Sequence, residues 1–160
     1  MCCKYIQRLF YDNFLKNDNS STCIFNDMLD GPMIDIVRFS IGEEYEIKLK
    51  AMAKEAGLSF FDEGDLRRDG FDKTPDLLLA VQCLYNGIAI NWIESKASFG
   101  DPDSHSKYMR DQLSSYQNRF GTGIVIYWFG YHEDIGNMKN GDLIILDVFP
   151  EKEKLTLLEF

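Results

Sequence analysis

The sequence predicts an α/β domain with a mixed β-sheet flanked by helices, in the order α-β-β-β-α-β. Two short apolar runs joined by Asn86-Gly87 are typical of a β-hairpin. Stretches with apolar residues at helical spacing precede and follow this hairpin. Residues 124–129 form a continuous apolar run, typical of a strand buried on both faces. A chain of 160 residues with 45% hydrophobic content is long enough for one domain with its own core.

The elements before the hairpin are a short N-terminal helix, a long helix and a short strand. We interpret residues 1–30 as a short helical and linker segment, residues 31–150 as the main domain and residues 151–160 as a charged C-terminal tail. Asp30 can cap the long helix, Pro32 suits its first turn and Gly57 can end it. Residues 58–61 are expected to form the strand, and residues 62–73 a polar connection.

A second helix and two strands are expected after the hairpin. Asp103 or Ser104 can cap the helix, which runs to about Arg119. One of its faces carries five residues: Met109, Gln112, Leu113, Tyr116 and Phe120. The strand at 124–129 follows, then a turn at Asn140-Gly141 and a last strand over residues 143–148.

The hairpin carries charged residues where its two strands end. Asp76 begins the first strand, and Glu94 and Lys96 end the second, so an antiparallel pairing brings all three together. Glu94 and Lys96 share one face of their strand because side chains alternate. Two carboxylates with an ammonium group are a combination that can hold a hard divalent cation and act on a phosphate. The Ser95 carbonyl could add a ligand.

Glu46 is the third candidate carboxylate. The long helix has an apolar stripe formed by Ile41, Tyr45, Leu49, Met52 and Ala56. Glu46 lies near the edge of this stripe, so it could bind a cation directly or through a second metal ion. The alternative is an ordinary solvated glutamate.

Candidate substrate-positioning residues lie on both sides of the hairpin. Gln112 and Tyr116 are i,i+4 neighbours on a largely apolar helix face, where a satisfied core glutamine and a packing tyrosine are the alternative. Residues 67–119 have seven acidic and seven basic residues, against an excess of acids elsewhere. Lys73 and Arg119 could therefore belong to a local basic rim that also includes Arg67, Arg68, Lys96, Lys107 and Arg110. A solvated mixed surface is the alternative.

Composition excludes several other classes of function. The net charge of −9 argues against a general polyanion-binding protein. No apolar run approaches the roughly 18 residues that a membrane span needs, so no membrane partner is expected. The four cysteines contain no C-x-x-C pair, which predicts reduced thiols of an intracellular protein and no zinc site. His105 is expected to be a surface residue near a helix start, with a general base or phosphate contact as the alternative.

Context, and not the bare Glu-x-Lys triplet, supports the site. The chain has a second copy, Glu46-Ile47-Lys48, which falls on the long helix and before Pro75-Asp76. The copy at Glu94-Ser95-Lys96 ends a hairpin strand, between one helix that carries a glutamate and another that carries Gln112 and Tyr116. Phosphodiester hydrolysis fits this arrangement.

These motifs resemble those of a nuclease superfamily. Pro75-Asp76 with Glu94-Ser95-Lys96 looks like the PD-(D/E)xK signature of restriction-endonuclease-like nucleases, and Gln112 with Tyr116 is similar to the Gln-x-x-x-Tyr helix of its RecB-type branch. Glu46 matches the first-helix glutamate of that superfamily. The resemblance implies a restriction-endonuclease-like core in which these residues bind Mg²⁺ or Mn²⁺, position water and contact nucleic acid.

A closer resemblance is to the codanin-interacting nuclease family, also called after its Thr-Pro-Asp motif. It rests on residues 72–76, 91–101, 118–121 and 125–130, and covers roughly residues 30–150. It implies a metal-dependent nuclease of nucleus and cytoplasm that binds codanin and is linked to red-cell maturation. One departure is that family members have an additional N-terminal helical region, where this chain has only about 30 residues, as expected of a fragment, a short isoform or a reduced gene model.

Three hypotheses follow for the hairpin charges. The first is a metal-dependent nuclease acting on DNA or structured nucleic acid. The second is a nuclease fold retained as a scaffold for codanin, which the net charge of −9 favours. The third is a purely structural salt bridge between Glu94 and Lys96, although such pairs contribute little to stability.

Overall fold

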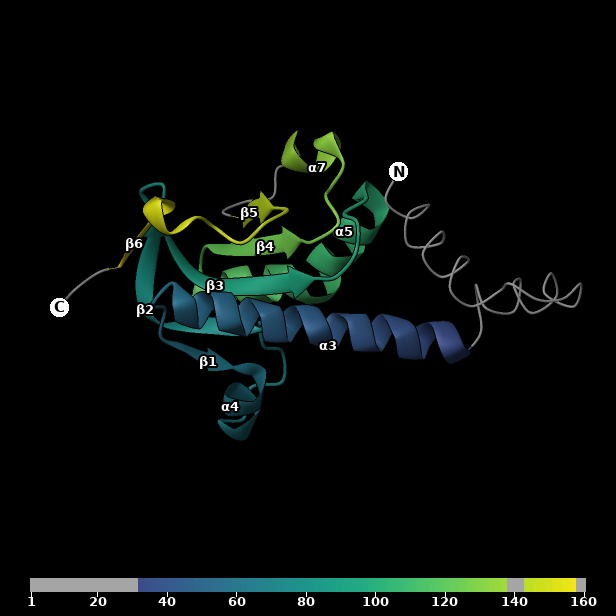
Figure 1. Ribbon diagram of the computed structural model, residues 1–160, viewed down its shortest axis with the longest axis horizontal. Coiled ribbons are helices and arrows are strands. Elements are labelled where there is room, and N and C mark those ends of the chain that lie inside the picture. Colours follow the sequence, from purple (N-terminus) through teal and green to yellow (C-terminus); the bar gives the residue numbers. More distant parts are fainter. Residues whose placement is uncertain (1–31, 138–142, 158–160) are drawn as a thin grey trace, which may run out of the picture. The chain divides into compact units, whose positions relative to one another are not determined.

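The computed structural model describes residues 32–137 and 143–157 (Figure 1). The chain divides into two compact units, Met1–Glu43 and Glu44–Phe160, and the sheet belongs to the second. In order, the elements are α3 (Pro32–Glu55), β1 (Phe60–Asp62), α4 (Glu63–Arg68), β2 (Leu77–Tyr85), β3 (Ile88–Lys96), α5 (Pro102–Tyr108), the π-helical turn η1 (Met109–Leu113), α6 (Ser114–Phe120), β4 (Gly123–Tyr127), α7 (Glu133–Asn137), β5 (Leu143–Leu146), the 3₁₀ turn η2 (Lys152–Lys154) and β6 (Leu155–Leu157).

The sheet is mixed, which confirms the predicted fold class. Strands β1, β2 and β3 pair antiparallel, whereas β3, β4 and β5 pair parallel, and β6 pairs antiparallel with β2. The predicted hairpin is formed by β2 and β3. Asn86 and Gly87 both have positive φ, at 48° and 82°, which is the geometry of a type I′ turn and matches the twist of the two strands.

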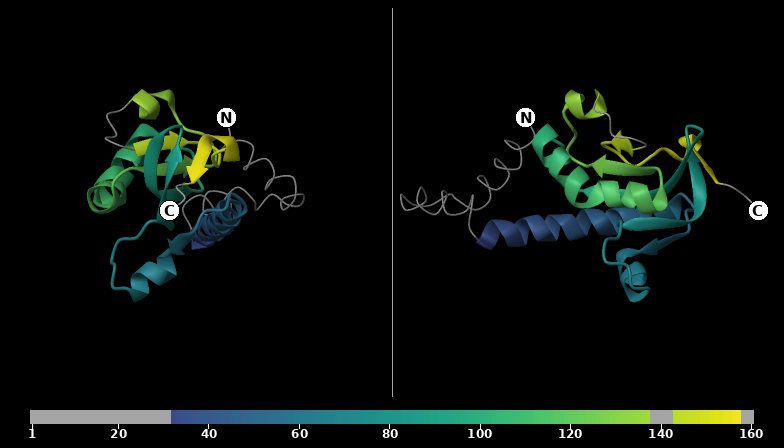
Figure 2. Two further views of the ribbon diagram at one scale, coloured as in Figure 1. Left: turned by 90° about the vertical axis from the view of Figure 1, so that its left-hand side faces the viewer. Right: turned by 180° about the vertical axis from the view of Figure 1, so that it is seen from behind.

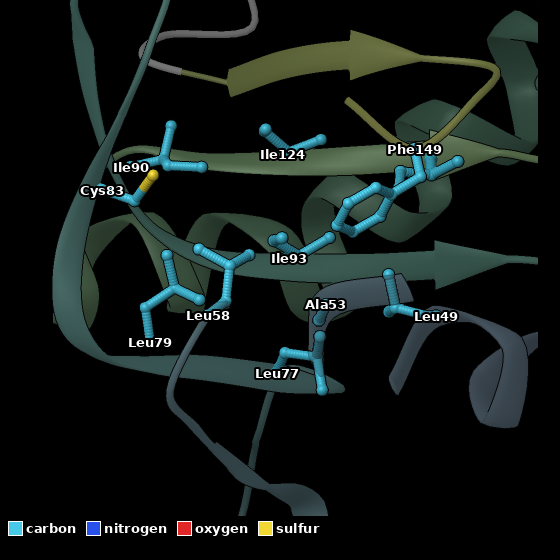
Figure 3. Packing of buried hydrophobic residues seen from close by; sticks show 11 residues of the cluster. Leu49, Ala53, Leu58, Leu77, Leu79, Cys83, Ile90, Ile93, Ile124 and Phe149 are labelled. Carbon is cyan, nitrogen blue, oxygen red and sulfur yellow. The ribbon is translucent and has the colours of Figure 1, made fainter. Parts of the chain in front are cut away.

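Each face of the sheet has its own apolar cluster. The first includes Leu49 and Ala53 of α3 together with Ile93 of β3 and Ile124 of β4, and in Figure 3 Ile93 lies between Ile124 and the two helix residues. The second joins Leu113 and Tyr116 to the opposite face, where α5 and α6 lie along the sheet (Figure 2). Strand β4 is buried along its whole length, as predicted, but it ends at Tyr127, whereas the predicted run continues through Trp128 and Phe129, which are half-buried. Among the described residues, no helix is both long enough and apolar enough to cross a bilayer.

The helix ends differ in part from those predicted. Helix α3 begins at Pro32, and Gly57 follows its end with a φ of 82°, as predicted. The prediction of Asp103 or Ser104 as the next cap is wrong. Asp101 caps α5 and its carboxylate accepts a hydrogen bond from the Ser104 N–H at 2.9 Å, because Pro102 occupies the first helical position. The predicted single helix reaches Phe120 but contains the π-helical turn η1.

Other elements were not predicted. The polar connection contains α4, which Asp62 and Asp65 begin with a capping box. Strand β1 starts at Phe60, two residues later than expected. Strand β5 ends at Leu146, two residues earlier than expected. A further strand, β6, lies in the segment that was interpreted as a tail. The predicted helix within residues 1–30, the Asp30 cap and the turn at Asn140-Gly141 lie outside the described residues.

Candidate active site

A polar cavity of about 380 Å³ lies where β2 begins and β3 ends. Its walls come from α3, α4, the loop before β2, β3, η1 and α6. The lining residues are Glu46, Glu63, Arg67, Asp72, Lys73, Thr74, Asp76, Glu94, Ser95, Lys96, Asp111, Gln112 and Tyr116. The structure thus brings together every predicted site residue except Arg119.

The hairpin register places Asp76 directly beside Glu94. Leu77 pairs with Ile93, so the next position outward on each strand is Asp76 and Glu94. The Asp76 N–H donates to Glu94 Oε2 at 3.2 Å, and the Ser95 N–H donates to Asp76 Oδ2 at 2.7 Å. These two bonds hold both carboxylates at one end of the hairpin. The side chain of Glu94 is only 5% exposed.

Lys96 completes the constellation from the face of β3 that also carries Glu94. Its ammonium group donates to Glu94 Oε1 at 2.7 Å and to Gln112 Oε1 at 3.1 Å, and it lies 4.7 Å from the centre of the Tyr108 ring. Burial alone would lower the pKa of Lys96, but the Glu94 carboxylate, together with Asp76 and Tyr108, outweighs burial and raises it. Lys96 is therefore a cation in this site, suited to stabilising negative charge and not to accepting a proton.

Asp76 has an excess of negative charge around it. Burial raises its pKa well above the usual range, and the negative charges of Glu94 and then Glu46 add to this effect, while the Ser95 N–H and Lys96 oppose it. A divalent cation bound by these carboxylate oxygens would relieve this repulsion, and so the donor set fits Mg²⁺ or Mn²⁺.

A second observation supports a ligand at this place. Among the side chains that the structure describes, those of residues 34–136 and 143–157, Thr74 Oγ1 is the one buried polar atom without a hydrogen-bond partner, and Thr74 lines the cavity. A buried polar atom of this kind usually binds a water molecule or an ion. However, the described part of the chain contains no group of three or more His, Cys, Asp or Glu side chains arranged to hold a metal ion. Two carboxylates, the Ser95 carbonyl and waters would have to supply the ligands, and Glu46 is a further carboxylate of the cavity wall.

The raised pKa of Asp76 predicts the pH dependence of an Asp76→Asn variant. The folded state binds the proton of the Asp76 carboxyl group more tightly than the unfolded state does, so ionisation of Asp76 lowers the free energy of unfolding. This loss grows as the pH rises from about 4 through the raised pKa. In EDTA, Asp76→Asn should therefore become progressively more stable than wild type over this range. Urea unfolding at pH 4–7 measures the difference, in which the contributions of carboxylates distant from Asp76 cancel. A difference that does not change with pH would contradict the raised pKa.

Gln112 and Tyr116 act on the site through other residues. Gln112 accepts from Lys96, and the Tyr116 hydroxyl donates to the Thr74 carbonyl at 2.7 Å. Tyr116 is 3% exposed and packs edge-on against Trp92. Gln112 therefore orients the ammonium group, and Tyr116 fixes the loop that carries Thr74 and Asp76.

The two basic residues predicted to position substrate differ in location. Lys73 lines the cavity, and its ammonium group donates to the Asp111 carbonyl at 2.7 Å. Arg119 is absent from the lining, and it donates to the Lys73 carbonyl at 3.3 Å and packs against the rings of Phe71 and Phe120. Arg67, from the predicted rim, lines the cavity beside its ion-pair partner Glu63.

Some residues were missed or misplaced by sequence reasoning. Thr74 was identified only as part of a motif, although a threonine before Pro-Asp is a signal for a polar group at the start of β2. Glu63 was missed because α4 was not predicted, whereas Arg67 had been predicted as part of the basic rim. The surface interpretation of His105 is wrong, because its side chain is fully buried and its Nδ1 lies 2.9 Å from the Tyr127 hydroxyl.

The chain matches a family model and several curated sequences. The model described as "Protein of unknown function TPD sequence-motif" matches residues 12–149. The chain is similar to proteins named CDAN1-interacting nuclease 1: it is 49% identical to that of Xenopus laevis over 129 residues, 46% to that of Homo sapiens over 128 and 45% to that of Danio rerio over 128. These matches cover 80–81% of this chain but 43–46% of the relatives, so the chain spans less than half of their length. No solved structure matches the chain.

Proposed function

This chain belongs to the family of the TPD sequence motif, and on that premise we propose that it is a metal-dependent nuclease that hydrolyses phosphodiester bonds of DNA or structured nucleic acid. The observation that carries the proposal is the convergence of Asp76, Glu94 and Lys96 at one end of the hairpin. The name of the relatives, which describes them as nucleases, supports it. The PD-(D/E)xK resemblance belongs to the same proposal.

Some residues of the site would hold a cation, and Lys96 would stabilise negative charge on the phosphate. Asp76, Glu94 and the Ser95 carbonyl would hold Mg²⁺ or Mn²⁺, with Glu46 contributing directly or through water. When bound, such a cation lowers the pKa of a coordinated water and neutralises charge on the phosphate. The Lys96 ammonium donates to an oxygen of the phosphate as negative charge develops there.

Gln112 and Lys73 prepare the substrate side of the cavity. Gln112 keeps the Lys96 ammonium directed at the cavity, so that no reorientation is needed during the reaction. Lys73 offers a cation at the cavity wall for an adjacent phosphate, and Arg119 supports the backbone of Lys73 from outside. We propose these as positioning roles, which follow from the contacts of each side chain.

A cleavage screen tests the proposed function. Purified protein is incubated with single-stranded, duplex, flap and junction substrates in Mg²⁺ or Mn²⁺. We expect cleavage of at least one of them, complete inhibition by EDTA, and no cleavage by Glu94→Ala. Robust cleavage by Glu94→Ala, or cleavage that persists in EDTA, would refute the assigned site.

A binding scaffold is the second candidate function. Both carboxylate oxygens of Glu94 already have protein partners, Lys96 and the Asp76 N–H, and this arrangement would also suit a site that has lost its metal. The printed name of the relatives describes interaction with CDAN1, and we propose a codanin-like protein as a partner of this chain too. Calorimetry with Mg²⁺ separates the candidates, because no heat of binding at millimolar concentration would favour the scaffold. Location in nucleus and cytoplasm stays a prediction from the family resemblance.

A further inference from the structure

An aromatic cluster lies at the end of β4, outside the cavity. It is formed by Tyr45 of α3 with Trp128 and Phe129, which directly follow β4. The ring centres of Tyr45 and Trp128 are 5.3 Å apart, and those of Tyr45 and Phe129 are 5.4 Å apart in an edge-to-face arrangement. All three side chains are half-buried, so part of each ring remains accessible to solvent. The cluster therefore presents aromatic surface and is not enclosed in the core.

An exposed lysine lies over this aromatic surface. The Lys48 ammonium is 4.6 Å from the centre of the Trp128 ring and 5.0 Å from that of Tyr45. The same ammonium group could pair with a phosphate next to a base that stacks on these rings. Aromatic rings with one adjacent cation match a nucleotide, which combines a flat base with a charged phosphate.

Ser95 links the aromatic cluster directly to the candidate active site. Its hydroxyl oxygen accepts a hydrogen bond from Trp128 Nε1 at 2.8 Å, while its N–H donates to Asp76 Oδ2 at 2.7 Å. The backbone N–H of Trp128 donates to the Lys96 carbonyl at 3.1 Å. On α3, Tyr45 immediately precedes Glu46, which lines the cavity. The aromatic surface and the carboxylates thus meet at the end of β3.

We propose that Tyr45 and Trp128 form a stacking subsite for an unpaired nucleobase next to the phosphate that occupies the candidate active site. This inference rests on the proposed nuclease function and names its substrate class as nucleic acid with unpaired nucleotides at the site of cleavage. A duplex keeps its bases stacked inside, so its bases cannot reach the two rings without being extruded.

The charge of the protein makes stacking the more important source of affinity. With a net charge of −9, the chain can neutralise few phosphates, so binding through the backbone alone would be weak. Stacking on aromatic rings contributes about 1–3 kcal/mol per base, depends little on sequence and requires no net positive charge. We therefore expect single-strand affinity to fall less steeply with salt than for a basic nucleic-acid-binding protein.

Binding of labelled oligothymidylate tests the subsite. Fluorescence anisotropy in EDTA, which prevents metal-dependent cleavage, gives Kd for a strand of roughly 15 nucleotides, for its duplex with oligoadenylate and for an abasic strand of equal length. We expect wild type to bind the single strand most tightly. Tyr45→Ala should raise Kd about 5- to 150-fold for the single strand, the range that corresponds to loss of one stacked base, and should leave Kd for the abasic strand unchanged.

Matched variants separate stacking from loss of structure. Tyr85→Ala removes a half-buried tyrosine at the other end of β2 and should leave Kd unchanged. Because Trp128→Phe keeps an aromatic ring, its Kd should lie within a few-fold of that of wild type, although the variant loses the hydrogen bond to Ser95. The chain has two tryptophans and Trp92 is fully buried, so oligothymidylate should quench the fluorescence of wild type but not of Trp128→Phe.

The outcomes distinguish this inference from the proposed function. Equal affinity for single strand, duplex and abasic strand, or an unchanged Kd in Tyr45→Ala, would overturn the subsite, even if Glu94→Ala abolishes cleavage. Failure of wild type to bind oligothymidylate would overturn it as well. Tyr45-dependent binding by a protein that cleaves nothing in Mg²⁺ or Mn²⁺ would support the subsite and refute the nuclease.

Discussion

Glu94→Gln is expected to lower metal-dependent cleavage by at least about 10³-fold, which corresponds to about 4 kcal/mol of transition-state stabilisation. The glutamine keeps the size of the side chain and an acceptor for the Asp76 N–H, which lies 3.2 Å from Glu94 Oε2. It removes the negative charge that would bind the cation. Initial rates on the preferred substrate at saturating Mg²⁺ measure the effect, and circular dichroism checks the fold.

Glu44→Gln is the matched control for this variant. Glu44 is an exposed glutamate of α3, so its substitution changes the net charge by the same amount without altering the cavity. We expect Glu44→Gln to cleave like wild type. If the two variants had the same activity, Glu94 would have no part in the reaction.

The sheet and the meeting of the site residues at one end of the hairpin could be predicted because local signals indicate them. Asn86-Gly87 specifies a tight type I′ turn, and the turn fixes the register next to it, where Tyr85 pairs with Ile88. The direct pairing of Asp76 with Glu94 could not be predicted, because the register shifts between Leu78 and Cys83, and without this shift Asp76 would lie opposite Ala97. Alternation along β3 places Lys96 on the face of Glu94 in either register.

The features that were missed depend on distant contacts or on competing local signals. Strand β6 has three residues and exists because Leu155–Leu157 pairs with the far end of β2. The π-helical turn η1 adds a residue to one turn and has no simple sequence signature. His105 lies on a helix with polar neighbours, and its burial results from contact with Tyr127 of β4.

The second Glu-x-Lys copy shows how context can mislead as well as guide. Sequence reasoning set Glu46-Ile47-Lys48 aside because it lies on a helix. In the structure Glu46 lines the cavity, whereas Lys48 lies over Tyr45 and Trp128. A spacing of two residues points the two side chains in different directions on a helix, so the copy cannot form an ion pair like that of Glu94 and Lys96 but can serve two adjacent surfaces.

Lys96→Met is expected to destabilise the protein in EDTA by about 3–5 kcal/mol, because it leaves the buried Glu94 carboxylate without its cation. Mg²⁺ should restore part of the lost stability, since a bound cation replaces the missing positive charge. Urea unfolding with and without Mg²⁺ measures both effects. A loss of less than about 1 kcal/mol would contradict the stabilising role of the Lys96 charge beside the buried Glu94.

The double variant Glu94→Gln/Lys96→Met separates a structural ion pair from a functional one. Two neutral side chains of similar volume should restore most of the stability, because replacing both members of a buried ion pair is often neutral. Cleavage should nevertheless remain as low as in Glu94→Gln, since neither the ligand charge nor the Lys96 ammonium is present. If the double variant folds and cleaves like wild type, the pair is only a structural salt bridge. If it folds and does not cleave, the pair is retained for the chemistry, because the fold does not require it.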